Sequence, residues 1–138
     1  MLGIDPGQNT GLARFVDGEL TGLRTIQPFE LERVLRAAEP DVVVFEDSRL
    51  QSHVWTGGGA RAALAKIARN VGEIDAWCKL IEALAGDLGY KAIGVSPTAK
   101  GAKTSAKTFT ATTGFTGTTN QHERDAAMVA WPYRRARL

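Results

Sequence analysis

The sequence predicts a single α/β domain covering residues 1–138, and three observations support this prediction. With 138 residues, of which 43% are hydrophobic, the chain is long enough for one core and too short for two ordinary domains. Short apolar runs alternate with longer segments whose apolar residues recur at helical spacing. Tight turns separate the first three runs, whereas a helical segment precedes each of the last two. The order predicts an antiparallel meander followed by two parallel strands reached through crossover helices.

The meander begins almost at the first residue. Pro6-Gly7-Gln8-Asn9 is typical of a turn after the first apolar run. Asp17-Gly18 is a two-residue signal for a tight hairpin between the second and third runs. Three strands are therefore expected, over residues 2–5, 11–16 and 19–26.

Two helical segments connect the meander to the later strands. Pro28 suits the first turn of a helix, and Pro40 ends it. The second segment, residues 60–88, keeps an apolar period near 3.6. Gly72 interrupts this apolar pattern. Three explanations are open: a kink in the helix, a close contact between the helix and a strand, or a glycine that the helix simply tolerates. The two later strands are expected over residues 42–46 and 92–95.

The last third of the chain is polar and basic. A connection over residues 97–104 leads to a short helix near 105–112, and a final helix begins near Gln121 and ends or kinks at Pro132. Residues 91–121 contain four lysines and neither Asp nor Glu. This local charge suits a polyanionic partner, although ordinary solvated charge is the simpler alternative. The net charge of +2 does not establish a nucleic-acid partner by itself.

Several classes of protein are disfavoured by composition. Cys78 is the only cysteine, so no intramolecular disulfide can form, and its helical context predicts a core or interface thiol and not a nucleophile. The start lacks the features of a signal peptide, and no apolar run is long enough to span a bilayer. We therefore expect a cytoplasmic protein without a membrane partner.

The most informative residues are three acids at the ends of elements. Asp5 and Glu46 each end an apolar run, and Asp125 opens a stretch of small residues. Acids at the ends of buried strands normally project into a cleft. Carboxylates gathered there repel one another unless a cation neutralises them, and hard oxygen ligands favour Mg²⁺ or Mn²⁺. The chemistry predicted for such a cluster is metal-assisted phosphodiester hydrolysis.

His122 lies three residues before Asp125, so both side chains can point from one helical face at one ion. We interpret His122 as a metal ligand or as an acid/base near the water or leaving group. Each residue also has an ordinary explanation: Asp5 as a turn-initiating acid, Glu46 as a loop-edge acid, and His122 and Asp125 as residues of a helix start. Their occurrence together favours a site.

Four motifs occur in order along almost the whole chain: Gly3-Ile4-Asp5-Pro6-Gly7…Thr10-Gly11, Val43-Val44-Phe45-Glu46, Val95-Ser96-Pro97…Lys100 and His122-Glu123-Arg124-Asp125-Ala126-Ala127. Together they resemble the RuvC family of Holliday-junction resolvases, within the ribonuclease H-like superfamily. The compact size resembles a phage or prophage member. The resemblance implies a five-stranded mixed sheet flanked by helices, with strands 1–3 antiparallel and strands 4 and 5 parallel. It places Asp5, Glu46 and Asp125 at the family's acid positions, and His122 where many members have an acid and some have His.

The resemblance implies an endonuclease that resolves Holliday junctions by paired symmetric nicks, leaving 5′-phosphate and 3′-hydroxyl ends. Two Mg²⁺ ions, or Mn²⁺ in their place, would be bridged by Asp5 and completed by Glu46, Asp125 and His122. No nucleotide cofactor is expected. Two symmetric cuts imply a homodimer, for which the helix of residues 60–88 is the candidate interface.

Candidate DNA contacts are Arg49, Trp55, Lys100, Lys103 and Lys107. The lysines lie beside the metal site by resemblance and would hold phosphates without reading bases. Several family members have an aromatic wedge two or three residues beyond the second acid, where this chain has Asp47-Ser48-Arg49. His53 and Trp55 could substitute by stacking on unpaired bases, although Trp55 could equally pack beneath the glycine-rich loop.

Three alternatives remain open. The missing wedge favours a less selective endonuclease acting on flaps, forks and other branched DNA. A non-catalytic junction-binding protein is disfavoured, because acids beside a DNA groove repel phosphate without a metal. An actin-like ATPase would share the Asp-x-Gly…Thr-Gly pattern, but it needs two such subdomains and the chain has residues for one.

Overall fold

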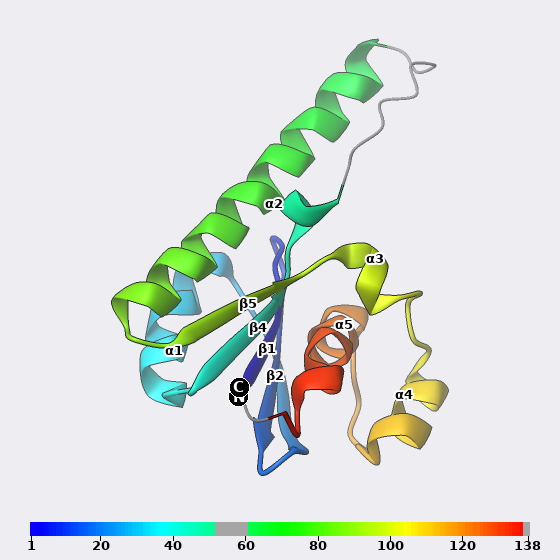
Figure 1. The fold of residues 1–138 in the computed structure, drawn as a ribbon. Coiled ribbons are helices and arrows are strands. Elements are labelled where there is room, and N and C mark those ends of the chain that lie inside the picture. Colours follow the sequence, from blue (N-terminus) through cyan, green and yellow to red (C-terminus); the bar gives the residue numbers. More distant parts are fainter. Residues whose placement is uncertain (52–60, 137–138) are drawn as a thin grey trace.

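A computed structural model of the chain describes residues 1–51 and 61–136, apart from the side chains of Ala62, Leu64 and Lys100. It contains a five-stranded mixed sheet in the order β3-β2-β1-β4-β5 (Figure 1). The strands are β1 (Leu2–Asp5), β2 (Thr10–Val16), β3 (Glu19–Ile26), β4 (Val42–Glu46) and β5 (Lys91–Val95). β1 to β3 pair antiparallel, and β4 pairs parallel with both β1 and β5. The predicted fold class is confirmed.

The helices are α1 (Leu31–Ala38), α2 (Arg61–Asp87), α3 (Pro97–Lys100), α4 (Ala106–Thr113) and α5 (Gln121–Ala130). The predicted hairpin turn is confirmed, because Asp17 and Gly18 both have positive φ, 50° and 82°. The helix α3 was not predicted; it begins where Ser96 is the N-cap and Pro97 occupies the first turn. The interpretation of Gly72 as a close contact with a strand is wrong, since a Cβ there would meet nothing within 4 Å. No helix in the described ranges has the length and apolar character needed to cross a membrane.

The two faces of the sheet carry separate cores. α1 and α2 cover the face that buries Ile4, Leu12 and Phe45, whereas α5 covers the face that buries Ala13 and Val44 (Figure 1). Successive strand residues alternate between the faces. Asp5 therefore lies on the α5 side of β1, and Glu46 on the α5 side of β4. The last registered pair of β1 and β4 is Ile4 with Phe45, so the two acids follow it at the same edge.

Two glycines allow α5 to lie unusually close to the sheet. A Cβ at Gly3 would stand 2.3 Å from the carbonyl oxygen of Ala126, and one at Gly11 would stand 2.0 Å from that of His122. Only a residue without a side chain fits at either position. The first motif of the chain is therefore partly structural: its glycines bring the backbone of α5 against β1 and β2.

Candidate active site

One cavity, of about 480 Å³, opens at the carboxyl ends of β1 and β4. Asp5, Glu46, His122 and Asp125 all line it, so the structure brings together the four residues that the sequence indicated. They come from three elements that are far apart in sequence. Lys103 from the connection after α3 also lines the cavity, and Val71 and Ile74 of α2 contribute apolar wall. The catalytic and ligand roles of the four residues stay predictions.

Asp5 and His122 are in direct contact, with 3.1 Å between the carboxylate Oδ2 and the imidazole Nδ1. The Asp5 side chain is 14% exposed and the His122 side chain 46%. The imidazole therefore stands at the mouth of the cavity and the carboxylate deeper within it. With Nδ1 engaged by Asp5, Nε2 is the ring nitrogen left for another partner.

Asp125 is buried, at 5% exposure, and one turn of helix fixes its direction. The Nε2 group of Gln121 donates to Asp125 Oδ1 at 3.0 Å. The start of α5 is held by a capping box, in which the Asn120 side chain accepts from the backbone N–H of Glu123 and the Glu123 carboxylate accepts from that of Asn120. The Asn120 side chain also donates a hydrogen bond to the Thr25 hydroxyl on β3, and that hydroxyl donates to the Glu123 carboxylate. The helix start is thereby anchored to the sheet as well as to itself.

Arg124 is a residue whose importance the sequence did not indicate. Its guanidinium donates to the carbonyl oxygen of Thr104 at 2.9 Å, to that of Thr119 at 2.9 Å and to Gln121 Oε1 at 2.9 Å. Arg124 thus fastens the connection bearing Lys103 to the helix bearing Asp125. In sequence it looks like any surface arginine of a helix, because Thr104 and Thr119 lie in loops outside α5, 20 and 5 residues away.

The segment after Glu46 turns towards α2. Asp47 is buried, at 4% exposure, and both of its carboxylate oxygens accept hydrogen bonds from Arg49 at 2.7 Å. Arg49 also forms an ion pair with Glu82 of α2. The hydrogen bonds from Arg49 hold the pKa of Asp47 below its usual range, although burial acts in the opposite direction.

The five candidate DNA contacts are placed unequally. Lys103 and Lys107 are both exposed, on the connection and on α4. Lys100 ends α3, and its side chain lies outside the described part. Arg49 is 24% exposed and already engaged by two carboxylates. Trp55, like His53, falls outside the described residues.

No protein-family model matches the chain, and no curated protein matches it. Among solved structures, the chain is similar to Thermus thermophilus RuvC in complex with a Holliday junction substrate, with a TM-score of 0.63, 17% identity, and coverage of 94% of this chain and 88% of that one. A second Thermus thermophilus RuvC structure matches with a TM-score of 0.59, 15% identity, and coverage of 94% and 90%. The fold is ribonuclease H-like. At these identities the likeness establishes the architecture alone.

In this ribonuclease H-like fold, the donor set of the cavity suits a hard divalent cation, because three carboxylates and one imidazole face a shared space. As their side chains stand, however, no three His, Cys, Asp or Glu residues within the described ranges form a group that could hold an ion. The donors have the chemistry for a metal site, and ligation requires them to converge further than they do here.

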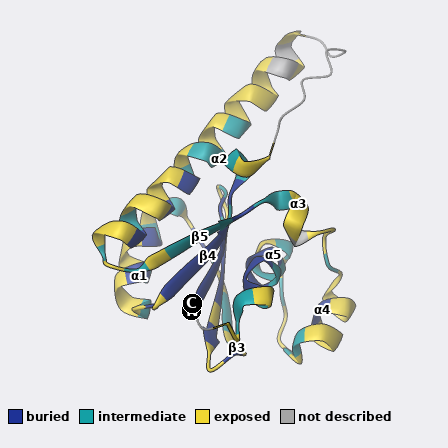
Figure 2. Ribbon diagram, viewed as in Figure 1, coloured by how far each residue is buried: buried dark blue, intermediate teal, exposed yellow. Residues whose placement is uncertain are grey.

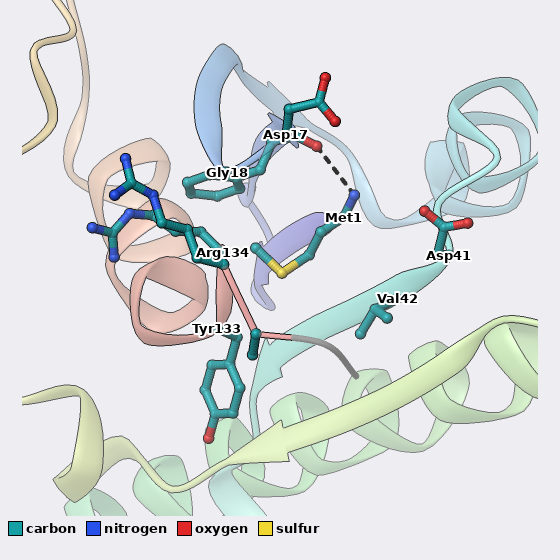
Figure 3. A pocket seen from close by; sticks show the side chains of 10 residues that line it. Met1, Asp17, Gly18, Asp41, Val42, Tyr133 and Arg134 are labelled. Atoms are coloured by element: carbon teal, nitrogen blue, oxygen red, sulfur yellow. Dashed lines mark hydrogen bonds between the residues drawn. The ribbon is translucent and has the colours of Figure 1, made fainter.

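A larger cavity, of about 720 Å³, lies at the opposite end of the fold (Figure 3). Met1 and Asp41, which precede β1 and β4, stand on its rim with Tyr133 and Arg134. The Arg134 guanidinium stacks 3.8 Å from the ring centre of Trp131, so it is occupied within the chain. Size therefore does not identify the site; the chemistry of the lining residues at the carboxyl ends of the strands does.

Proposed function

We propose that this chain is a divalent-metal-dependent endonuclease that cuts four-way DNA junctions. The observation that carries the proposal is the meeting of Asp5, Glu46, His122 and Asp125 in one cavity at the carboxyl edge of the sheet. The likeness to a RuvC structure solved with a Holliday junction substrate supports the choice of DNA. Lys103 beside the carboxylates supports a phosphate-bearing substrate.

Asp5, Glu46, Asp125 and His122 would hold Mg²⁺ or Mn²⁺. When bound, a pair of such ions supplies a hydroxide nucleophile from water and charge neutralisation at the leaving 3′ oxygen. The chain's own residues orient this set. Gln121 fixes the direction of the Asp125 carboxylate, and the Asp5 contact to Nδ1 leaves Nε2 of His122 to bind an ion or carry a proton.

Lys100, Lys103 and Lys107 would hold DNA phosphates, without reading bases. Because Arg124 fastens the Lys103 connection to α5, a phosphate held there is placed relative to Asp125. Removing one of these lysines should reduce the salt slope of DNA binding by about one unit.

Paired cuts require two sites, and α2 is the proposed interface of a homodimer, over residues 60–88. The apolar stripe of α2 continues past the sheet, with Ile67 50% exposed and Val71 partly exposed. A two-fold partner would cover this stripe. A monomer at micromolar concentration by light scattering would contradict the paired-cut model.

The test is cleavage of end-labelled DNA with Mg²⁺ and with Mn²⁺, comparing a mobile four-way junction with forks, flaps, duplex and single strands. Symmetric nicks restricted to the junction are expected. Asp5→Asn and Asp125→Asn should each lose more activity than the roughly 10–100-fold typical of an outer-sphere metal partner, while still binding the junction. Near-normal cutting by either variant would refute the metal-site proposal.

A second candidate is a less selective branched-DNA endonuclease. The observation in its favour is that residues 47–51 contain no aromatic side chain, and that Arg49 among them is bound to Asp47 and Glu82. A wedge that opens the junction centre is therefore not found in that part of the loop. Cutting of forks and flaps at rates similar to the junction would select this candidate.

A further inference from the structure

A polar cluster that the proposed reaction does not use lies beside the cavity, between the segment after β4 and α2. We call it the loop–helix cluster; its residues are Asp47, Ser48, Arg49, Asp75, Cys78 and Glu82. The three α2 residues are spaced by three and four positions, so they share one face of the helix. That face meets the three loop residues.

Asp47 is seated on β5. Its backbone N–H donates to the carbonyl oxygen of Val95 at 2.8 Å, which extends the pairing of β4 and β5 by one residue. Its carboxylate lies against the bare backbone of Gly94, where a Cβ would stand 2.7 Å from Oδ2. The acid that follows Glu46 therefore has a defined position on the sheet.

Arg49 links the Asp47 carboxylate to α2. Its Nε and Nη2 groups donate to the two oxygens of Asp47 at 2.7 Å each, in the forked geometry available to arginine alone. Its Nη1 group donates to Glu82 Oε2 at 3.0 Å. The guanidinium thus spans from the end of β4 to the helix.

Two further contacts tie the cluster to the cavity itself. The Cys78 thiol donates to the backbone carbonyl of Glu46 at 3.5 Å, and the Ser48 hydroxyl donates to Asp75. Ser48 and Glu46 both line the cavity, as does Ile74, the neighbour of Asp75. Displacing the cluster would therefore move Glu46 and the α2 wall together.

We propose that Asp47 and Arg49 are a positioning pair. The pair sets the direction of the Glu46 side chain and the position of α2 beside the cavity, so that the site can bind an ion. Arg49 then acts through Asp47 and not by holding a DNA phosphate. The inference rests on the proposed function, because Glu46 matters to it as an ion ligand. A positioning role can be distinguished from a DNA-contact role for Arg49 by measurement. If the two residues act as a pair, substituting Asp47 and substituting Arg49 should weaken ion binding to the same extent.

The test measures Mn²⁺ binding by calorimetry on the DNA-free protein, and the salt slope of junction binding in EDTA. Asp47→Asn and Arg49→Gln should each weaken Mn²⁺ binding by about 10–100-fold, the range for loss of an outer-sphere partner, with the salt slope unchanged. The double variant should be no weaker than the worse single one, because both break one pair. Arg36→Gln, which breaks an Arg–Glu pair on remote α1, should change neither quantity.

Arg49→Lys and Glu82→Gln keep the test decisive if the first variants unfold. Lysine retains the charge but not the fork, so Arg49→Lys should still weaken Mn²⁺ binding. Glu82 is 60% exposed, and its loss leaves Asp47 paired, so Glu82→Gln should fold and weaken Mn²⁺ binding only a few-fold. If Arg49→Lys or Arg49→Gln binds Mn²⁺ normally, the positioning role is refuted; a salt slope lowered by about one unit in Arg49→Gln would assign Arg49 to DNA instead. Wild-type protein that binds no Mn²⁺ would refute the proposed function as well.

Discussion

The helices on the two faces of the sheet reach the cavity by different means. α5 lies against the sheet backbone to backbone, through Gly3 and Gly11, and presents His122 and Asp125 to the cavity. α2 packs on the sheet through its second half, around Cys78, whereas its first half extends beyond the sheet and is largely exposed (Figure 2). It is joined to the end of β4 by ion pairs and hydrogen bonds.

The difference teaches how each side keeps its geometry. Close backbone packing excludes alternatives sterically, so a shift of a few tenths of an ångström meets repulsion. Charged hydrogen bonds are directional but depend on ionisation and on both partners being present. Substitutions that add volume beneath α5 should therefore disturb its packing on the sheet. Substitutions that remove charge should disturb the contacts between α2 and the end of β4.

The largest expected effect comes from adding one methyl group under α5. Gly11→Ala places a Cβ where the carbonyl oxygen of His122 already lies, so the helix must move and stability should fall by about 3 kcal/mol, the upper end for overpacking. Gly22→Ala on β3 is the matched control, because a Cβ there meets nothing within 4 Å; it should stay within about 0.5 kcal/mol of wild type. Urea unfolding measures both. Equal stabilities for the two variants would contradict the packing account.

A smaller loss is expected from Arg124→Met. It removes the donors to the carbonyl oxygens of Thr104 and Thr119 but leaves the close packing of α5 intact. We expect about 1–2 kcal/mol of destabilisation, together with weaker junction binding, because the connection bearing Lys103 is released. Arg36→Met, which loses only an exposed pair on α1, should cost less than about 0.5 kcal/mol. Unchanged junction binding by Arg124→Met would show that the connection needs no anchor.

The smallest effect is the pH dependence of the α2 side. The folded-state pKa of Asp47 is lowered by Arg49, so its contribution to stability is fully present above the unfolded-state pKa, near 3.9, and is lost as pH falls through the lower folded-state value. Stability measured between pH 5 and pH 2 should therefore decline more for wild type than for Asp47→Asn. If the stability of wild type and of Asp47→Asn declined equally with falling pH, Arg49 would not lower the pKa of Asp47 in the folded state.

The sequence predicted features that are local. Strands, the hairpin at Asp17 and the acids at strand ends follow from short patterns, and the structure agrees with each of them within a few residues. The partners of Gly11, Arg49 and Arg124 were not predictable in this way. Gly11 meets a helix more than 100 residues later, and the Arg49–Glu82 pair spans 33 residues. Such pairings depend on how elements pack, which no local pattern encodes.

The contact between Asp5 and His122 joins residues 117 positions apart. During synthesis the first strand leaves the ribosome long before α5 exists, and domains form their long-range contacts only when both partners are available. A nascent chain that has not yet reached residue 125 therefore has Asp5 and Glu46 but no complete cavity. The cavity that we propose as the active site is therefore completed only after α5 has been synthesised and has packed against β1 and β2.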